Sequence, residues 1–212
     1  MDTKILDMLD KIILKGKEMQ MSDDEFFSFC QANPDLNIER NAQREIIIMS
    51  PTGSNAGSIN AGISFQLYQW NDKHNLGITF DSSTGFTLPD QSVKSPDAAW
   101  LSLEKWQKLS EEEQEKFAPV CPEFVIELKS KNDRLDDLQE KMKSWIENRA
   151  QLAWLIDPES KTVYVYQPDQ EVHVYQNFDQ PLSAEPVLPG FALDFSKLRL
   201  SKNQAQSVPK SR

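Results

Sequence analysis

The sequence predicts a domain of the α/β or α+β class, in which helices pack on a mixed β-sheet. Short runs with the alternation of strands are interleaved with segments whose apolar residues recur at helical spacing, an order typical of such domains. The chain has 212 residues, of which 39% are hydrophobic. That is enough for one domain with a buried core and modest appendages. We therefore expect a soluble globular protein.

The N-terminal segment is predicted to be helical. Its apolar residues recur at helical spacing: Ile5, Met8, Leu9, Ile12 and Ile13. Ser22 and Glu25 then form a capping-box pattern, which predicts that a helix begins ahead of the run FFSFCQAN.

Two strands and a long helix are expected next. ERNAQREIIIMS contains two short strand-like runs around a polar turn at residues 41–43, and PTGSNAGS has the small and polar residues of a loop. The helix after this loop would present four large apolar residues on one side: Ile59, Ile63, Leu67 and Trp70.

Three strands and a charged insert fill the middle of the chain. The strands are expected in GITFDSS, GFTLP and PDAAWLSL, with a turn at Pro89 and Asp90 between the second and the third. The insert covers residues 104–117 and contains an S-x-x-E cap from Ser110 to Glu113, which predicts short surface helices.

The second half continues with strand, helix, strand and a hairpin. EFVIELK is a predicted strand, and Asn132 or Asp133 is the expected cap of the helix that follows it. That helix carries an apolar stripe: Leu135, Leu138, Met142, Trp145 and Ile146. QLAWLIDP is a predicted strand, and TVYVY with EVHVYQ a predicted hairpin. The last twelve residues are polar and mildly basic, and we expect them to be disordered.

Composition argues against several classes of protein. A net charge of −10 and a pI near 4.8 argue against coating nucleic acid through overall charge. No apolar run approaches the roughly 18 residues that span a bilayer, and no signal peptide is recognisable, so we expect no membrane partner and a cytoplasmic location. Cys30 and Cys121 lack C-x-x-C spacing and are expected to be reduced thiols. The solitary His74 and His173 argue against a His-rich metal site or a Ser-His-Asp triad.

The run PEFVIELKSKND is unusual because a strand that looks buried carries a Glu and a Lys. Strand alternation places Glu127 and Lys129 on one face, opposite Phe124, Ile126 and Leu128. One interpretation is an amphipathic strand with a wet face, where this pair is a surface contact contributing roughly 0–1 kcal/mol. The other is a functional pair.

Chemistry favours a functional pair if Asp97, which opens the preceding strand after Pro96, lies nearby. Two carboxylates brought close together raise each other's pKa unless a cation lies between them, so they are a natural site for Mg²⁺. Such a cation can assist phosphodiester hydrolysis, and a neighbouring lysine can orient water or balance charge on the phosphate. The pattern alone is weak, because an Asp after a Pro is also a common turn former.

Taken in order, several motifs resemble the PD-(D/E)xK nuclease superfamily and, within it, the Uma-two family of restriction endonucleases. The resemblance covers residues 44–198 and rests on REIIIMSPTGSNAG, LGITFDSSTGFTLP, SPDAAWLSLEKW, CPEFVIELKSKNDRL, LQEKMKSWIENRAQLAWLIDP and VLPGFALDF. It implies a restriction-endonuclease-like core at residues 25–200. Residues 1–24 would then be a helical extension and residues 201–212 a disordered tail.

The resemblance also implies site residues. Asp97 matches the motif aspartate, Glu127 the second acid and Lys129 the motif lysine, while Glu45 matches an acid that often precedes the MSP turn. Asp97 and Glu127 would bind Mg²⁺, with Mn²⁺ as a substitute. The histidine that members commonly place at the start of the next helix is missing. Lys141 could reach the site from the following helix, but a solvated helix face is the expectation for it.

The resulting hypothesis is a Mg²⁺-dependent endonuclease that cuts DNA. A homodimer is expected, because two twofold-related sites cut both strands most simply, and the N-terminal helix is a candidate contact. Two alternatives remain open. One is a nuclease fold kept as a binding module for nucleic acid or protein without cleavage, since fold does not prove activity. The other is a structural or interaction protein, which only the N-terminal helix and the acidic insert support.

Overall fold

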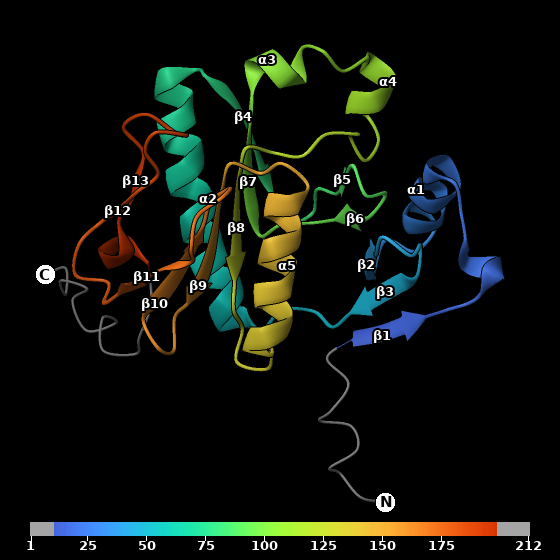
Figure 1. Ribbon diagram of the computed structural model, residues 1–212, viewed down its shortest axis with the longest axis horizontal. Coiled ribbons are helices and arrows are strands. Elements are labelled where there is room, and N and C mark those ends of the chain that lie inside the picture. Colours follow the sequence, from blue (N-terminus) through green and yellow to red (C-terminus); the bar gives the residue numbers. More distant parts are fainter. Residues whose placement is uncertain (1–10, 199–212) are drawn as a thin grey trace, which may run out of the picture.

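The computed structural model describes residues 11–198. It consists of two main β-sheets, with helices packed on both faces of the larger one (Figure 1). This confirms the predicted class, a mixed sheet flanked by helices. The first ten residues of the predicted N-terminal helix and the predicted tail at residues 201–212 lie outside the described part of the chain.

The larger sheet has six strands in the order β11-β10-β9-β8-β7-β4. In chain order its strands are β4 (Gly77–Asp81), β7 (Ala98–Ser102), β8 (Phe124–Leu128), β9 (Leu152–Asp157), β10 (Thr162–Tyr166) and β11 (His173–Gln176). β8 and β9 are parallel, and the other neighbours are antiparallel. The predicted hairpin is thus confirmed as β10 and β11.

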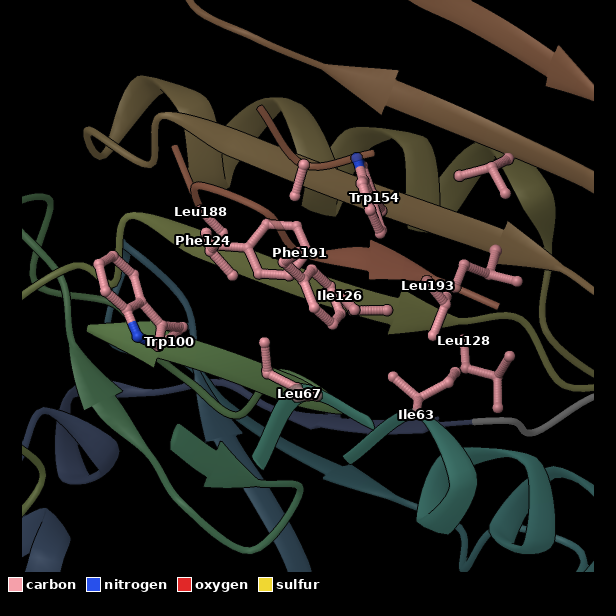
Figure 2. Close-up of a cluster of buried hydrophobic side chains, with 14 of the residues drawn as sticks. Ile63, Leu67, Trp100, Phe124, Ile126, Leu128, Trp154, Leu188, Phe191 and Leu193 are labelled. Carbon is pink, nitrogen blue, oxygen red and sulfur yellow. The ribbon is translucent and has the colours of Figure 1, made fainter. Parts of the chain in front are cut away.

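Helix α2 (Ser54–His74) covers one face of this sheet, and α5 (Leu135–Glu147) lies against the other (Figure 1). The four apolar residues predicted to share one side of α2 are all buried against the sheet. Figure 2 shows two of them, Ile63 and Leu67, on the same side of the sheet as Ile126 and Leu128 of β8. The helical spacing in the sequence therefore identified the core-facing side of α2.

Strand β8 is buried on both faces. Phe124 and Ile126 belong to the core under α2, whereas Val125 packs in the core under α5 with Met142 and Trp145. The alternation read from the sequence is confirmed. The interpretation of an amphipathic strand with a wet face is wrong, because α5 covers the face that carries Glu127.

The smaller sheet has five strands in the order β1-β3-β2-β6-β5 and carries helix α1 (Asp23–Gln31). Its strands are β1 (Lys11–Leu14), β2 (Asn37–Arg40), β3 (Ile46–Met49), β5 (Phe86–Thr87) and β6 (Val93–Lys94). The predicted capping box at Ser22 and Glu25 begins α1. The predicted boundary between the N-terminal extension (residues 1–24) and the core (residues 25–200) would fall inside this helix.

The N-terminal prediction is wrong for residues 11–14. These residues form β1, which pairs with β3 in an antiparallel register from Lys11 opposite Met49 to Leu14 opposite Ile46. Adjacent apolar residues such as Ile12 and Ile13 fit an edge strand as well as a helix, and the available partner strand decided between them. The N-terminal helix was the candidate dimer contact, and residues 11–14 of that segment are a strand instead.

The remaining elements are short. They are α3 (Leu103–Trp106), α4 (Glu111–Gln114), β12 (Leu182–Ser183), β13 (Ala192–Leu193) and two 3₁₀ helices. The capping box predicted at Ser110 and Glu113 begins α4. The predicted cap of α5 is wrong, because Arg134 is the N-cap residue and Asp133 instead accepts a hydrogen bond from the Ser130 backbone N–H at 2.7 Å.

Within residues 11–198, no helix is both long and apolar enough to cross a membrane.

Candidate active site

The pairing of β7 with β8 brings Asp97 and Glu127 together. Ala98 lies opposite Ile126, so one further step of this antiparallel register places Asp97 opposite Glu127, with both side chains on the α5 side of the sheet. Asp97 Oδ2 accepts a hydrogen bond from the Leu128 backbone N–H at 2.7 Å. The two acids predicted as metal ligands therefore lie side by side at one end of the central strands.

Glu127 is buried between the sheet and α5. Only 4% of the residue is exposed, and its Oε1 accepts a hydrogen bond from Trp145 Nε1 at 2.9 Å. The Lys141 ammonium lies at 2.9 Å from the same oxygen. Residues 141 and 145 are one helical turn apart, so α5 holds this carboxylate from two successive turns.

Lys141 bridges two acids from different sheets. Its Nζ lies 2.9 Å from Glu127 Oε1 and 2.9 Å from Glu39 Oε1, and it donates to the Ser95 carbonyl oxygen at 3.2 Å. Its side chain is 18% exposed. The expectation that Lys141 lies on a solvated helix face is wrong, because Glu39 of β2 and the Ser95 carbonyl oxygen, just after β6, contact its ammonium.

Glu39 was missed by sequence reasoning. It lies in β2 between Ile38 and Arg40, is 5% exposed, and also accepts a hydrogen bond from the Ser95 backbone N–H at 3.0 Å. A signal was available, since a carboxylate between buried neighbours in a strand needs a partner. The sequence did not show which strand or helix would supply it.

Glu45 shares no hydrogen-bond or ion-pair partner with these acids among residues 11–198. Its carboxylate accepts a hydrogen bond from Asn41 Nδ2 at 2.7 Å and lies 3.3 Å from Lys15 Nζ. The contact with Asn41 closes the β2–β3 turn, and the contact with Lys15 ties this turn to the residue after β1. Glu39, which the sequence did not single out, is the acid that shares Lys141 with Glu127, and the role predicted for Glu45 stays a prediction.

Lys129 lies at the end of β8 but makes a different contact from the one expected. Its backbone N–H continues the pairing with β9 by donating to the Ile156 carbonyl oxygen at 2.8 Å, and its Nζ donates to the Ser130 carbonyl oxygen at 3.1 Å. In the part of the chain that the structure describes, its ammonium forms no ion pair with Glu127. The ammonium that pairs with the motif acid comes from Lys141 instead.

Burial governs the electrostatics of the cluster. It raises the pKa of Glu127 to about 7, an effect that Lys141 opposes and the nearby carboxylates of Asp97 and Glu39 reinforce. Burial also raises the pKa of Asp97, although the hydrogen bond from Leu128 works against it. For Lys141, burial disfavours the ammonium, but Glu127 and Glu39 outweigh it and raise its pKa above the ordinary range.

The donor set suits a divalent cation with oxygen ligands. Between residues 11 and 198, no group of three or more His, Cys, Asp or Glu side chains is arranged to hold a metal ion. Mg²⁺ does not need one, since it is usually held by one or two carboxylates together with waters and substrate phosphates. Asp97 and Glu127 supply two such carboxylates, and a cation between them would offset the burial and the carboxylate repulsion that together raise the pKa of Glu127. The residues present therefore fit Mg²⁺ or Mn²⁺.

The raised pKa of Glu127 has a testable effect on stability. A carboxyl whose pKa is higher in the folded than in the unfolded state favours folding at low pH, and this contribution is lost as pH rises from about 4.5 through about 7. Glu127→Gln removes the titration. Relative to wild type, the variant should therefore gain roughly 3 kcal/mol of unfolding free energy between pH 4 and pH 8.

Urea unfolding of both metal-free proteins at several pH values measures this gain. Asp136→Asn, an exposed change on α5, is the control and should follow wild type. Parallel pH profiles for wild type and Glu127→Gln would show that the carboxyl titrates normally.

The fold and the cluster define the class of this protein. A mixed sheet between helices, with acids at the ends of adjacent central strands, is the restriction-endonuclease-like arrangement that the sequence motifs implied. The chain belongs to the Uma2 (Uma-two) family, whose profile is described as "Putative restriction endonuclease" and matches residues 23–196.

A solved structure has the same fold. It is the crystal structure of a protein from Anabaena variabilis ATCC 29413, described as a "putative nuclease belonging to DUF820". The TM-score is 0.67 at 20% sequence identity, over 84% of this chain and 96% of that chain. At this identity the likeness establishes the fold alone. No curated protein matches the chain.

Proposed function

We propose that this protein is a metal-dependent endonuclease that hydrolyses phosphodiester bonds of DNA. The observation that carries the proposal is the pairing of Asp97 with Glu127 across two central strands, with Lys141 held between Glu127 and Glu39. Buried acids in this number are costly unless a cation compensates them. Membership of the Uma2 family supports the same activity.

The residues of the cluster would have different roles in the reaction. Asp97 and Glu127 would hold the cation through carboxylate oxygens, and the hydrogen bonds from Leu128 and Trp145 fix where those oxygens point. Lys141 supplies positive charge that opposes the rise in the pKa of Glu127 and so favours its ionised form. A divalent cation bound there would polarise the scissile phosphate and lower the pKa of the water that attacks it.

Supercoiled plasmid tests the proposal directly. Pure protein should convert it to cut forms in Mg²⁺ or Mn²⁺ and leave it intact in EDTA. Early linear product would indicate two coordinated sites and support the homodimer, whereas open circles that accumulate first would indicate single-strand nicks. Absence of cleavage on plasmid, single-stranded DNA and RNA alike would reject the nuclease and favour the non-cleaving binding module.

A further inference from the structure

All the N–H donors of the Lys141 ammonium face acceptors within the protein. An ammonium has three N–H donors. Those of Lys141 face three acceptors, which are Glu39, Glu127 and the Ser95 carbonyl oxygen. In this arrangement Lys141 orders the acids of the site, and any direct contact with a phosphate has to come from another group.

Lys94 is a second ammonium at the same cluster. It ends β6, its Nζ donates to Ser144 Oγ, and it lies 6.0 Å from the centre of the Trp145 ring. Trp145 is the residue that holds Glu127. The helix face that positions Glu127 through Lys141 and Trp145 therefore also positions Lys94 through Ser144.

The ammonium of Lys94 is only partly satisfied. Within residues 11–198, it forms one hydrogen bond, to a neutral hydroxyl, and no carboxylate lies within ion-pair distance of it. Burial lowers its pKa, and the more distant Glu39 offsets this only in part. Keeping such a cation half-buried costs stability without giving it a strong partner.

The acids whose charges act on Lys94, which are Glu39, Asp90 and Glu127, each have another partner. Asp90 accepts hydrogen bonds from the backbone N–H and hydroxyl of Ser92. Glu39 and Glu127 share Lys141. Within residues 11–198, two N–H donors of Lys94 thus remain without a protein acceptor, over the ring of the Trp145 that holds Glu127.

We propose that Lys94 binds the nucleic acid, donating a hydrogen bond to a phosphate oxygen of the strand that lies over Asp97 and Glu127. This inference rests on the proposed function and adds a substrate-contacting residue to it. A phosphate oxygen is the acceptor that two spare N–H donors on a cation would select. The same contact explains why a poorly compensated ammonium is kept at this position.

The test compares Lys94→Met, Lys94→Arg and the control Lys143→Met. Lys143 is exposed on the same helix as Lys141, so its substitution removes one positive charge outside the cluster. Binding of a fluorescent DNA duplex is measured by anisotropy in Ca²⁺ over a range of salt concentrations. Cleavage in Mg²⁺ and thermal melting are measured on the same proteins.

Lys94→Met should weaken duplex binding by about tenfold and reduce the slope of log affinity against log salt by about one. Cleavage should fall at least as much as binding does. Lys94→Arg should restore most of the affinity, and Lys143→Met should behave as wild type. The melting temperature of Lys94→Met should equal or exceed that of wild type.

Three results would overturn the inference. The first is wild-type affinity and salt slope in Lys94→Met. The second is a loss of affinity that follows a lower melting temperature and that Lys94→Arg does not restore, which would make Lys94 a structural tether between β6 and α5. The third is a wild-type protein that binds no duplex. If wild type binds duplex through Lys94 but cuts no nucleic acid, the proposed function fails and this inference stands.

Discussion

Asp97→Asn should reduce DNA cleavage by roughly a thousandfold, because the variant loses a carboxylate ligand for the cation and the several kcal/mol of charge stabilisation that the cation gives. Asn keeps an oxygen that can accept the hydrogen bond from the Leu128 backbone N–H, so the strand pairing should survive. The variant should also lose the rise in melting temperature that Mn²⁺ gives wild type. Mn²⁺ at a concentration a hundred times its dissociation constant stabilises the folded protein by about 2.7 kcal/mol, and the rise in melting temperature reports this gain.

Plasmid cleavage and Mn²⁺-dependent melting measure these effects. Asp136→Asn removes an exposed carboxylate from α5 and should match wild type in both assays. The metal assignment is wrong if Asp97→Asn and Glu127→Gln melt with the same Mn²⁺-dependent rise as wild type.

Lys141→Met should lower cleavage by roughly a hundredfold or more and should also destabilise the protein. Removing this ammonium leaves Glu39 and Glu127 buried without their partner, a change that typically costs about 3–5 kcal/mol. Because unfolding alone could abolish activity, the double variant Glu39→Gln with Lys141→Met is also required. It should melt closer to wild type, since one unpaired acid is neutralised, and should remain poorly active.

Lys129→Met tests whether catalysis depends on Lys129, the lysine of the sequence motif, or on Lys141, the lysine that contacts Glu127. Lys129 Nζ bonds only the Ser130 carbonyl oxygen among described groups, so Lys129→Met should melt like wild type. We expect it to retain more activity than Lys141→Met. The reverse order, in folded proteins, would return the catalytic role to Lys129 as the sequence motif predicts.

Local patterns in the sequence were sufficient for much of the framework. Helical spacing identified the buried side of α2, and strand alternation identified the two faces of β8. Both capping boxes begin helices where the pattern places them. These features depend on residues close together in the chain, so the sequence alone defines them. β1 shows the limit, because Ile12 and Ile13 carried no signal that separates an edge strand from a helix.

The sequence by itself determined two of the candidate acids, since Asp97 directly precedes and Glu127 lies in one of two consecutive strands that pair in the structure. Tertiary structure decided how the site is completed. Glu39 and Lys141 meet although they are 102 residues apart, because the smaller sheet packs against α5. The physical reason is that burial and charge pairing depend on which surfaces cover each other. Neither is encoded in the spacing of a single segment.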